Sequence, residues 1–173
     1  MALRKIFTDD AECLYKVSKP VLKFDMRLWQ LLDDMADTMY DAEGVGLAAP
    51  QVGILRRAFV IDIGEGLHEF INPKLVSTGG IQRGYEGCLS FPDKNGYVER
   101  PEVVVIRAFD RHGKEFELRG QGLMARALLH ENDHLDGKVY LRLVTDPPQD
   151  FLDEEKRRQK QEKKEENRGK REK

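Results

Sequence analysis

Residues 130–134 read H-E-N-D-H, which matches the pattern H-E-x-x-H. Residues four apart share one face of a helix, so His130 and His134 could bind one metal ion together. Glu131 lies beside a ligand in the sequence and would be placed as a general base toward a water that the metal activates. Catalytic metal sites usually have three protein ligands and one open position. The pattern therefore predicts a third ligand elsewhere in the chain.

The residues that follow the motif do not provide this ligand. In the class H-E-x-x-H-x-x-G-x-x-H, the glycine is matched by Gly137, but Tyr140 stands where the third histidine is required. A second class takes a glutamate from further downstream, where the chain offers Glu154 and Glu155. These two lie in a run of charges that is not expected to fold into a site. The third ligand is therefore expected upstream.

Four upstream residues have suitable side chains: His68, His112, Cys13 and Cys88. His112 falls in a predicted hairpin turn, His68 precedes a strand, and Cys13 stands in a polar segment. Cys88 lies in Y-E-G-C-L-S-F-P, where Gly87 allows close approach of the backbone. A thiolate with two imidazoles suits zinc or ferrous iron. The chemistry favours Cys88, although a lone cysteine beside a glycine is more often simply packed.

The composition indicates one domain followed by a charged tail. The chain has 173 residues, of which 40% are hydrophobic and 35% charged. Residues 153–173 hold 10 basic and 7 acidic residues, net +3, which leaves 19 basic and 24 acidic residues, net −5, in residues 1–152. This acidic balance offers no basic stripe for nucleic acid. We therefore expect a domain over residues 1–147 and a tail over residues 148–173.

Cellular setting can also be predicted from the sequence. Two cysteines are too few for a secreted disulfide scaffold, and the N-terminus lacks the apolar run of a signal peptide. No segment approaches the roughly 20 apolar residues that span a bilayer. A reducing, cytoplasmic setting without a membrane partner is expected.

Helical periodicity and turn residues predict the elements that position the motif. A helix is expected from the N-cap Asp25 to about Gly44, with apolar residues at spacings of three and four. Residues 44–53 are predicted as a loop, because they hold three glycines and a proline. A second helix is predicted over residues 122–135, with Gly137 as its C-terminal cap. Strands are predicted at 57–63, 68–76, 102–109 and 115–119, with a turn at 110–113. This order of elements indicates an α+β fold.

Three stretches of the chain together resemble the peptide deformylase family. They are G-V-G-L-A-A-P-Q-V-G at 44–53, E-G-C-L-S at 86–90 and H-E-N-D-H-L at 130–135. Their order and spacing match that family over about residues 1–145. The resemblance implies antiparallel sheets packed around a central H-E-x-x-H helix, with a second helix near the N-terminus. It also implies hydrolysis of the N-formyl group of N-formylmethionyl nascent peptides, with release of formate.

The resemblance also implies a role for individual residues. Cys88, His130 and His134 are expected to bind one divalent metal, with Fe2+ as the native ion and Zn2+, Ni2+ or Co2+ as substitutes. Glu131 is expected to be the catalytic base. The side-chain amide of Gln51 and the backbone N–H of Leu89 are expected to stabilise the oxyanion.

Substrate contacts are predicted on two elements. An extended peptide could pair with the backbone of Gly44, Val45 and Gly46, because the glycines leave no Cβ in its path. Leu123 and Ala127 continue the stripe of the two histidines at helical spacing, which predicts a wall of the methionine pocket.

Four further positions carry expectations of their own. Glu86 and Arg100 resemble family positions that can pair, and Asp133 is expected to point away from the metal. Leu129 departs from the glutamine that the family usually has before the first histidine. Its side chain is expected to face the interior.

Parts of the sequence also match three other functions. Residues 44–49 match the dinucleotide pattern G-x-G-x-x-A, but they follow a helix and precede Pro50, whereas that pattern requires a preceding strand and a following helix. No dinucleotide cofactor is expected. A metallopeptidase of another H-E-x-x-H class and a non-catalytic metal-binding protein are the remaining alternatives.

The tail carries its own expectations. It could form one helix, but no apolar stripe follows Leu152, so docking by burial is not expected. The interpretation without a binding role is a solvated tail. The resemblance implies a transient contact with the ribosome, which the net positive charge would suit.

Overall fold

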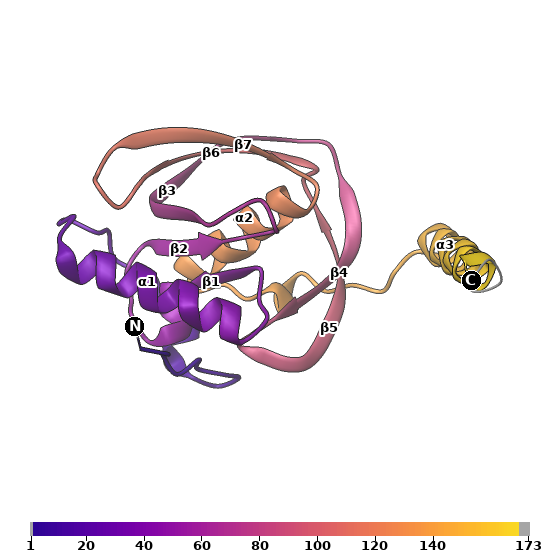
Figure 1. Ribbon diagram of the computed structural model, residues 1–173, viewed down its shortest axis with the longest axis horizontal. Helices are drawn as coiled ribbons and strands as arrows, with labels where there is room; N and C mark the ends of the chain where they lie inside the picture. The colour runs from indigo at the N-terminus through magenta and orange to yellow at the C-terminus, as the bar shows by residue number, and fades with distance from the viewer. Residues whose placement is uncertain (1, 170–173) are drawn as a thin grey trace.

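The computed structural model describes residues 2–169, and the side chains of residues 2–164 (Figure 1). Seven strands form two antiparallel sheets around one helix. The larger sheet has the order β1-β2-β3-β6-β7 and the smaller is the pair β4-β5. The strands are β1 (Gly46–Ala48), β2 (Ala58–Ile61), β3 (His68–Gly79), β4 (Gln82–Cys88), β5 (Phe91–Arg100), β6 (Val103–Phe109) and β7 (Glu115–Gln121). The predicted α+β class is confirmed.

Helix α1 (Met26–Asp41) covers one face of the larger sheet. It begins where the sequence predicts, because the Asp25 carboxylate accepts hydrogen bonds from the backbone N–H of Arg27 and Leu28, at 3.1 and 3.2 Å. Such a cap satisfies donors that the first turn leaves free. The apolar face of α1 packs with β1 and β2 in one buried cluster.

Helix α2 (Leu123–Leu135) lies inside the curve of the two sheets (Figure 1). Its apolar residues pack with Phe59, Phe70 and Ile106 of the larger sheet. Leu129 belongs to this cluster, so its side chain faces the interior as expected. Gly137 ends the helix with φ of +66°, and a Cβ there would lie 2.7 Å from the carbonyl oxygen of Tyr15. Glycine is the residue that fits both restrictions.

Two regions differ from the sequence-based expectation. Residues 44–53 are not a simple loop, because they contain β1 and a short 3-10 helix, η2 (Ala49–Val52). Strands β4 and β5 were not predicted, and β5 contains the turn-forming run Pro92–Gly96. Pairing of the two strands stabilises them, rather than the propensity of either one. Two further 3-10 helices are η1 (Glu12–Tyr15) and η3 (Tyr140–Arg142).

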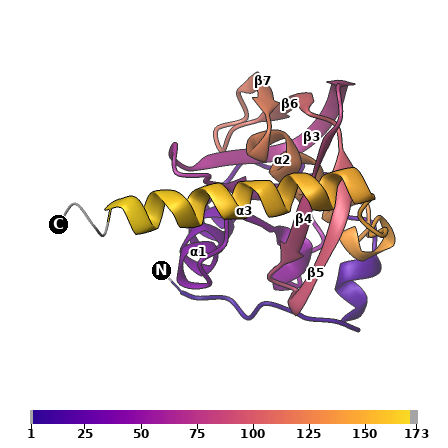
Figure 2. The same cartoon turned by 90° about the vertical axis from the view of Figure 1, so that its right-hand side faces the viewer.

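The tail forms helix α3 (Gln149–Gly169), which crosses the β4-β5 hairpin (Figure 2). Residues 170–173 lie outside the described part of the chain. The expectation that the tail does not dock by burial is wrong for its first turn: the Phe151 ring packs against Tyr97 and Tyr85, with centroids 4.8 and 5.9 Å apart. Arg83 also pairs with Asp150 at 2.7 Å.

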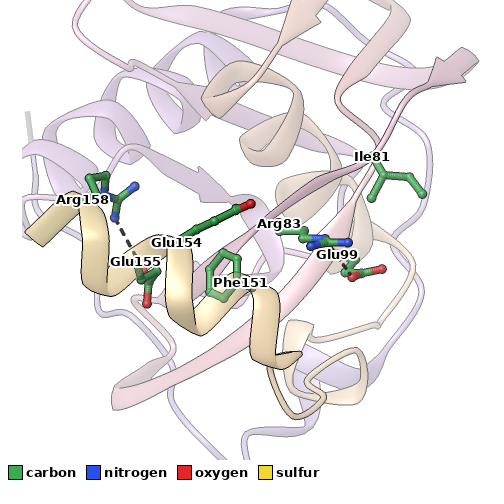
Figure 3. A pocket seen from close by; sticks show the side chains of 7 residues that line it. All are labelled: Ile81, Arg83, Glu99, Phe151, Glu154, Glu155 and Arg158. Carbon is green, nitrogen blue, oxygen red and sulfur yellow. Dashed lines mark hydrogen bonds and ion pairs between the residues drawn. The ribbon is translucent and has the colours of Figure 1, made fainter.

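Helix α3 also borders a pocket of about 610 Å³ (Figure 3). Charged side chains of both signs line it, together with Ile81 and Phe151. Among the described residues, no helix is both long and apolar enough to cross a membrane.

Candidate active site

Cys88, His130 and His134 come together in the folded chain. One ligand atom from each lies within 4.8 Å of the others, and Cys88 Sγ is 3.3 Å from His134 Nε2. The two histidines follow each other by one helical turn on α2, and their ring centroids are 5.1 Å apart. Cys88 is the last residue of β4, which lies across from α2. The cluster therefore combines a helix and a hairpin that are distant in sequence.

The hairpin β4-β5 aims Cys88 at the helix. Cys88 pairs with Phe91, so Leu89 and Ser90 form the tip of the hairpin. The strand register shifts between Glu86 and Cys88. A bulge of this kind re-aims a side chain at the end of a strand.

Glu86 holds His130 in one orientation. Its carboxylate is buried and accepts hydrogen bonds from Arg100 at 2.9 and 3.0 Å, from Arg126 at 2.8 Å and from His130 Nδ1 at 3.1 Å. Burial alone would raise the pKa of Glu86, but the bonds from His130 and Arg100 lower the pKa to about 2. The carboxylate stays charged and accepts from His130 Nδ1, which leaves Nε2 as the nitrogen that can bind a metal once it has lost its proton.

Arg100 links Glu86 to the part of α2 that lies between the two histidines of the motif. It also donates to Asp133 at 2.7 Å. Asp133 therefore points toward Arg100 and stabilises the position of the helix, in agreement with the sequence-based expectation.

Glu131 is buried beside the three candidate ligands. Its Oε2 atom has no hydrogen-bond partner among the described residues. Burial is the main reason that the pKa of Glu131 is raised, to about 7, and the neighbouring His130 partly opposes the effect. A carboxyl group with this pKa can accept and return a proton near neutral pH.

The donor set fits a divalent metal. A thiolate and two imidazoles are a common ligand set for zinc and ferrous iron. Burial lowers the pKa of His134 to about 3, so this imidazole is neutral and offers a lone pair. For His130, burial opposes the charged form, but Cys88 and Glu86 raise the pKa to about 10. Metal binding at His130 must therefore displace a proton.

The predicted substrate residues line one pocket next to this cluster. The pocket has a volume of about 370 Å³, within the usual range for ligand sites. It is bordered by all the residues that the sequence assigned to substrate or oxyanion: Gly44, Val45, Gly46, Gln51, Leu89, Leu123 and Ala127. Two of the other ligand candidates lie elsewhere: His112 packs edge-on against Trp29, and His68 borders another pocket.

Gln51 is held with its amide nitrogen toward the cluster. The Ala48 N–H donates to Gln51 Oε1 at 2.8 Å, which leaves Nε2 as the end that faces the hairpin. Nε2 donates to Ser90 Oγ at 3.1 Å and lies 3.5 Å from Cys88 Sγ.

Sequence reasoning missed three residues of the site. Arg126 is buried, contacts Glu86 and borders the pocket. The Tyr140 ring stacks on His130 with centroids 5.6 Å apart, and Ser90 accepts from Gln51. The available signal was Arg126 itself, a single charge within the apolar run of residues 123–129.

A Cys/His/His cluster beside a buried glutamate on an H-E-x-x-H helix defines a metal-dependent hydrolase. The dinucleotide alternative lacks its structural context, because residues 44–49 follow a helix and contain β1. Among the described residues the cluster has three potential ligands and no fourth, whereas a structural metal site normally closes with four.

Comparison with known proteins identifies the kind of hydrolase. Residues 3–149 match the family model described as polypeptide deformylase. A peptide deformylase of Caldicellulosiruptor bescii is 59% identical over 144 residues, which cover 83% of this chain and 87% of the relative. The crystal structure of a peptide deformylase from Legionella pneumophila matches with a TM-score of 0.81 and 47% identity, over 83% of this chain and 87% of that one. The chain belongs to the polypeptide deformylase family, whose activity is removal of the N-formyl group from nascent peptides.

A further solved structure shows a peptide in such an enzyme. It is a class I type b peptide deformylase from Acinetobacter baumannii with Met-Ala-Ser bound, and it is 30% identical with a TM-score of 0.79, over 83% of this chain and 99% of that one. The metallopeptidase and non-catalytic alternatives find no support in these comparisons.

Proposed function

We propose that Cys88, His130 and His134 hold one divalent metal, Fe2+ in the native protein, and that Glu131 is the catalytic base. The proposal rests mainly on one observation: a buried glutamate with an unpartnered carboxylate oxygen borders the same pocket as Cys88 and His130, whose ligand atoms converge with that of His134. When bound, a divalent metal supplies Lewis acidity, which makes water a better nucleophile and polarises the formyl carbonyl.

In this proposal, Glu131 is the group that transfers protons between the attacking water and the leaving amine. It accepts a proton from the attacking water and later donates one to the departing amine. Both transfers suit a carboxyl group with a pKa of about 7, because neither protonation state is strongly favoured near neutral pH. Burial in a pocket wall also keeps bulk water from competing for this proton.

Gln51 Nε2 and the Leu89 backbone N–H supply hydrogen bonds to the oxyanion. Gln51 is preoriented by its contacts with Ala48 and Ser90, so little reorganisation is needed during the reaction. Loss of one such donor typically costs about 100-fold or more in kcat.

N-formylmethionyl peptides are the proposed substrates. The peptide backbone pairs with Gly44, Val45 and Gly46 at the pocket rim, and the methionine side chain lies against Leu123 and Ala127. The tripeptide bound to the Acinetobacter relative begins with methionine, which supports this substrate class.

The central test is formate release from formyl-Met-Ala by the wild type and by Glu131→Ala. The variant should lose nearly all activity while its metal content stays equal to that of the wild type. Cys88→Ser should lose metal as well as activity, which separates the ligand role from the base role. Unformylated Met-Ala serves as the control substrate and should stay intact. Equal formate release by wild type and Glu131→Ala would overturn the assignment.

Native-metal identity needs its own measurement. Protein purified without oxygen should contain Fe2+ and lose activity in air, and reloading with Ni2+, Co2+ or Zn2+ should give a protein that tolerates air. Iron-free protein with full activity from anaerobic purification would contradict the assignment of Fe2+.

The charged tail is proposed as a transient ribosome contact, with residues 1–147 as the catalytic domain. Residues 153–173 carry a net charge of +3, which suits ribosomal RNA. Because nascent formylated peptides arise at the ribosome, the proposed setting is the cytoplasm. Truncation at residue 150 should reduce co-sedimentation with ribosomes while formate release from a dipeptide is retained. Equal co-sedimentation of both proteins at low salt would refute the contact.

A further inference from the structure

A second pocket, which shares no lining residue with the candidate active site, lies where α1 begins. It has a volume of about 710 Å³ and lies between the segment 19–23, the first turns of α1 and residues 54–56. Its apolar surface comes from Val21, Leu22, Leu28, Leu31 and Ile54. We call this pocket the α1 groove. None of the residues assigned to catalysis, metal or substrate borders it.

The charges around the α1 groove oppose those of the rest of the domain. Five basic residues and one acidic residue line it, a net charge of +4, whereas residues 1–152 together have a net charge of −5. The five are Arg4, Lys19, Lys23, Arg27 and Arg56. The one acidic residue, Asp25, caps α1 through its carboxylate.

Four of these cations have no carboxylate partner. Arg4 pairs with Asp34 at 2.9 Å. Within residues 2–164, no ion pair is made by the other four side chains, and all four are exposed: Lys19, Lys23, Arg27 and Arg56. Most other arginines of the domain are paired, including Arg57 with Asp136 and Arg111 with Glu69. The groove therefore combines an apolar floor with four cations that have no carboxylate partner among the described residues.

The wall of the groove is fixed by hydrogen bonds. The side chain of Asn72 accepts from the Val21 N–H and donates to the Val21 carbonyl, both at 2.8 Å. The Lys19 N–H donates to the Leu55 carbonyl at 3.1 Å, and the Arg57 N–H donates to the Lys19 carbonyl at 2.9 Å. The groove is thus preformed, which lowers the entropic cost of filling it.

Leu22 makes the groove unusual for a surface without a partner. Its side chain is 87% exposed at the groove edge. An apolar residue displayed between lysines suits a ligand that offers both apolar and acidic groups.

We propose that the α1 groove binds an acidic protein segment whose apolar side chains fill the floor while its carboxylates pair with the four free cations. An amphipathic helix is the form that presents both kinds of group along one face. The groove has no aromatic side chain among its lining residues, so it lacks the stacking surfaces that favour single-stranded RNA. A concave floor also fits a row of side chains better than a bilayer surface. The chain's own helix α3 is not the occupant, because it lies at the opposite end of the molecule (Figure 1).

The test uses a fluorescein-labelled synthetic helical peptide of about 15 residues, with leucines on one face and glutamates elsewhere. Fluorescence anisotropy should show saturable binding to the full-length protein. A peptide with every glutamate replaced by glutamine, and a peptide of scrambled order, should bind at least about tenfold more weakly. Equal binding of the glutamine peptide would overturn the proposal.

Variants locate the binding on the protein. The double variant Lys23→Glu with Arg56→Glu should raise the Kd for the acidic peptide by about tenfold or more, and so should Leu22→Asp alone. The matched controls are Lys74→Glu and Ile81→Asp, which change exposed residues outside the groove and should leave the Kd within about twofold. Formate release should be unchanged in all four variants. Equal Kd values for groove and control variants would refute the site.

Two further probes decide the class of partner. Phosphatidylglycerol vesicles and a single-stranded RNA oligonucleotide should bind no more strongly to the wild type than to the double variant. If either probe binds and is released by the groove substitutions while the acidic peptide does not bind, the proposed occupant is wrong.

Discussion

Gly46 is a position where one added methyl group should disable catalysis without disturbing the metal. Gly46 begins β1, and a Cβ built on it would lie 2.9 Å from Cδ and 3.0 Å from Cγ of Glu131. Carbon atoms in ordinary contact are about 3.5–4.0 Å apart, so Gly46→Ala must displace the Glu131 side chain by roughly 0.5–1 Å. The conformation of Gly46 is not the reason for glycine here, because its φ lies outside the left-handed region. The space that Glu131 occupies is the reason.

The expected loss follows from this displacement. A misplacement of about 1 Å at a reacting group can cost about 100-fold in rate. We therefore expect kcat for formyl-Met-Ala to fall about 100-fold in Gly46→Ala. Metal content should not change, because no candidate ligand is among the three atoms nearest the added Cβ, all of which belong to Glu131. Overpacking should lower the free energy of unfolding by about 1–3 kcal/mol.

Gly79→Ala is the matched control. Gly79 also lies in a strand without a positive φ, and a Cβ there would meet no atom within 4 Å. Its formate release should equal that of the wild type. The double variant Gly46→Ala with Glu131→Asp adds a second check, because the shorter side chain leaves room for the methyl group. Glu131→Asp should cost much less in the Gly46→Ala background than in the wild type. If Gly46→Ala keeps full activity, or if the two effects are simply additive, the reasoning is refuted.

Three further predictions concern the pocket, the tail and acid stability. Ala127→Phe should raise KM for formyl-Met peptides several-fold, because Ala127 borders the pocket, and an unchanged KM would exclude it as a wall of that pocket. Phe151→Ala should release α3 and make the tail a fast site of limited proteolysis, whereas Leu152→Ala should not, because Phe151 is the residue that packs on Tyr85 and Tyr97. Asp34→Asn should destabilise the protein by about 1 kcal/mol at pH 7 in urea unfolding. Burial alone would raise the pKa of Asp34, but hydrogen bonds from Gln30, from the Ala2 N–H and from Arg4 lower it. A lowered folded-state pKa gives stability that is fully present above the unfolded value of about 3.9 and is lost as pH falls through the folded-state pKa, so the difference between wild type and variant should shrink on acidification.

The sequence predicts elements well where local patterns and tertiary packing agree. Asp25 as an N-cap, the apolar face of α1 and the Gly137 cap of α2 all appear where expected. Strands β4 and β5 were missed because their sequences, Q-R-G-Y-E-G-C and F-P-D-K-N-G-Y-V-E-R, hold many glycines and polar residues. Their stability comes from cross-strand pairing and from contacts that no local window contains.

The tail shows the same limit at a single residue. The sequence indicates correctly that no apolar stripe continues after Leu152, but docking needs only one large side chain. Phe151 docks because Tyr85 and Tyr97, from the two strands that were not predicted, form its binding surface. A prediction of the tail therefore depended on first predicting the hairpin.

The candidate site also contains some residues that the sequence predicts and others that it does not. The helix α2 places His130, Glu131 and His134 by periodicity, which the sequence shows directly. Chemistry alone left the third ligand open among four residues, and the resemblance pointed to Cys88. Arg126 was missed because its partner Glu86 lies on β4, 40 residues away in sequence.

The buried charges explain how two distant segments can form one site. Glu86 on β4 receives hydrogen bonds from Arg126 and His130 of α2, and Arg100 on β5 joins Glu86 to Asp133 of α2. Each bond crosses between the hairpin and the helix or between the two strands, so the network fixes the distance at which Cys88 meets the histidines. A buried carboxylate without these partners would be strongly destabilising, whereas with them it is satisfied in one arrangement only. The H-E-x-x-H helix therefore provides the chemistry, and the charged network around Glu86 makes its third ligand arrive at the right place.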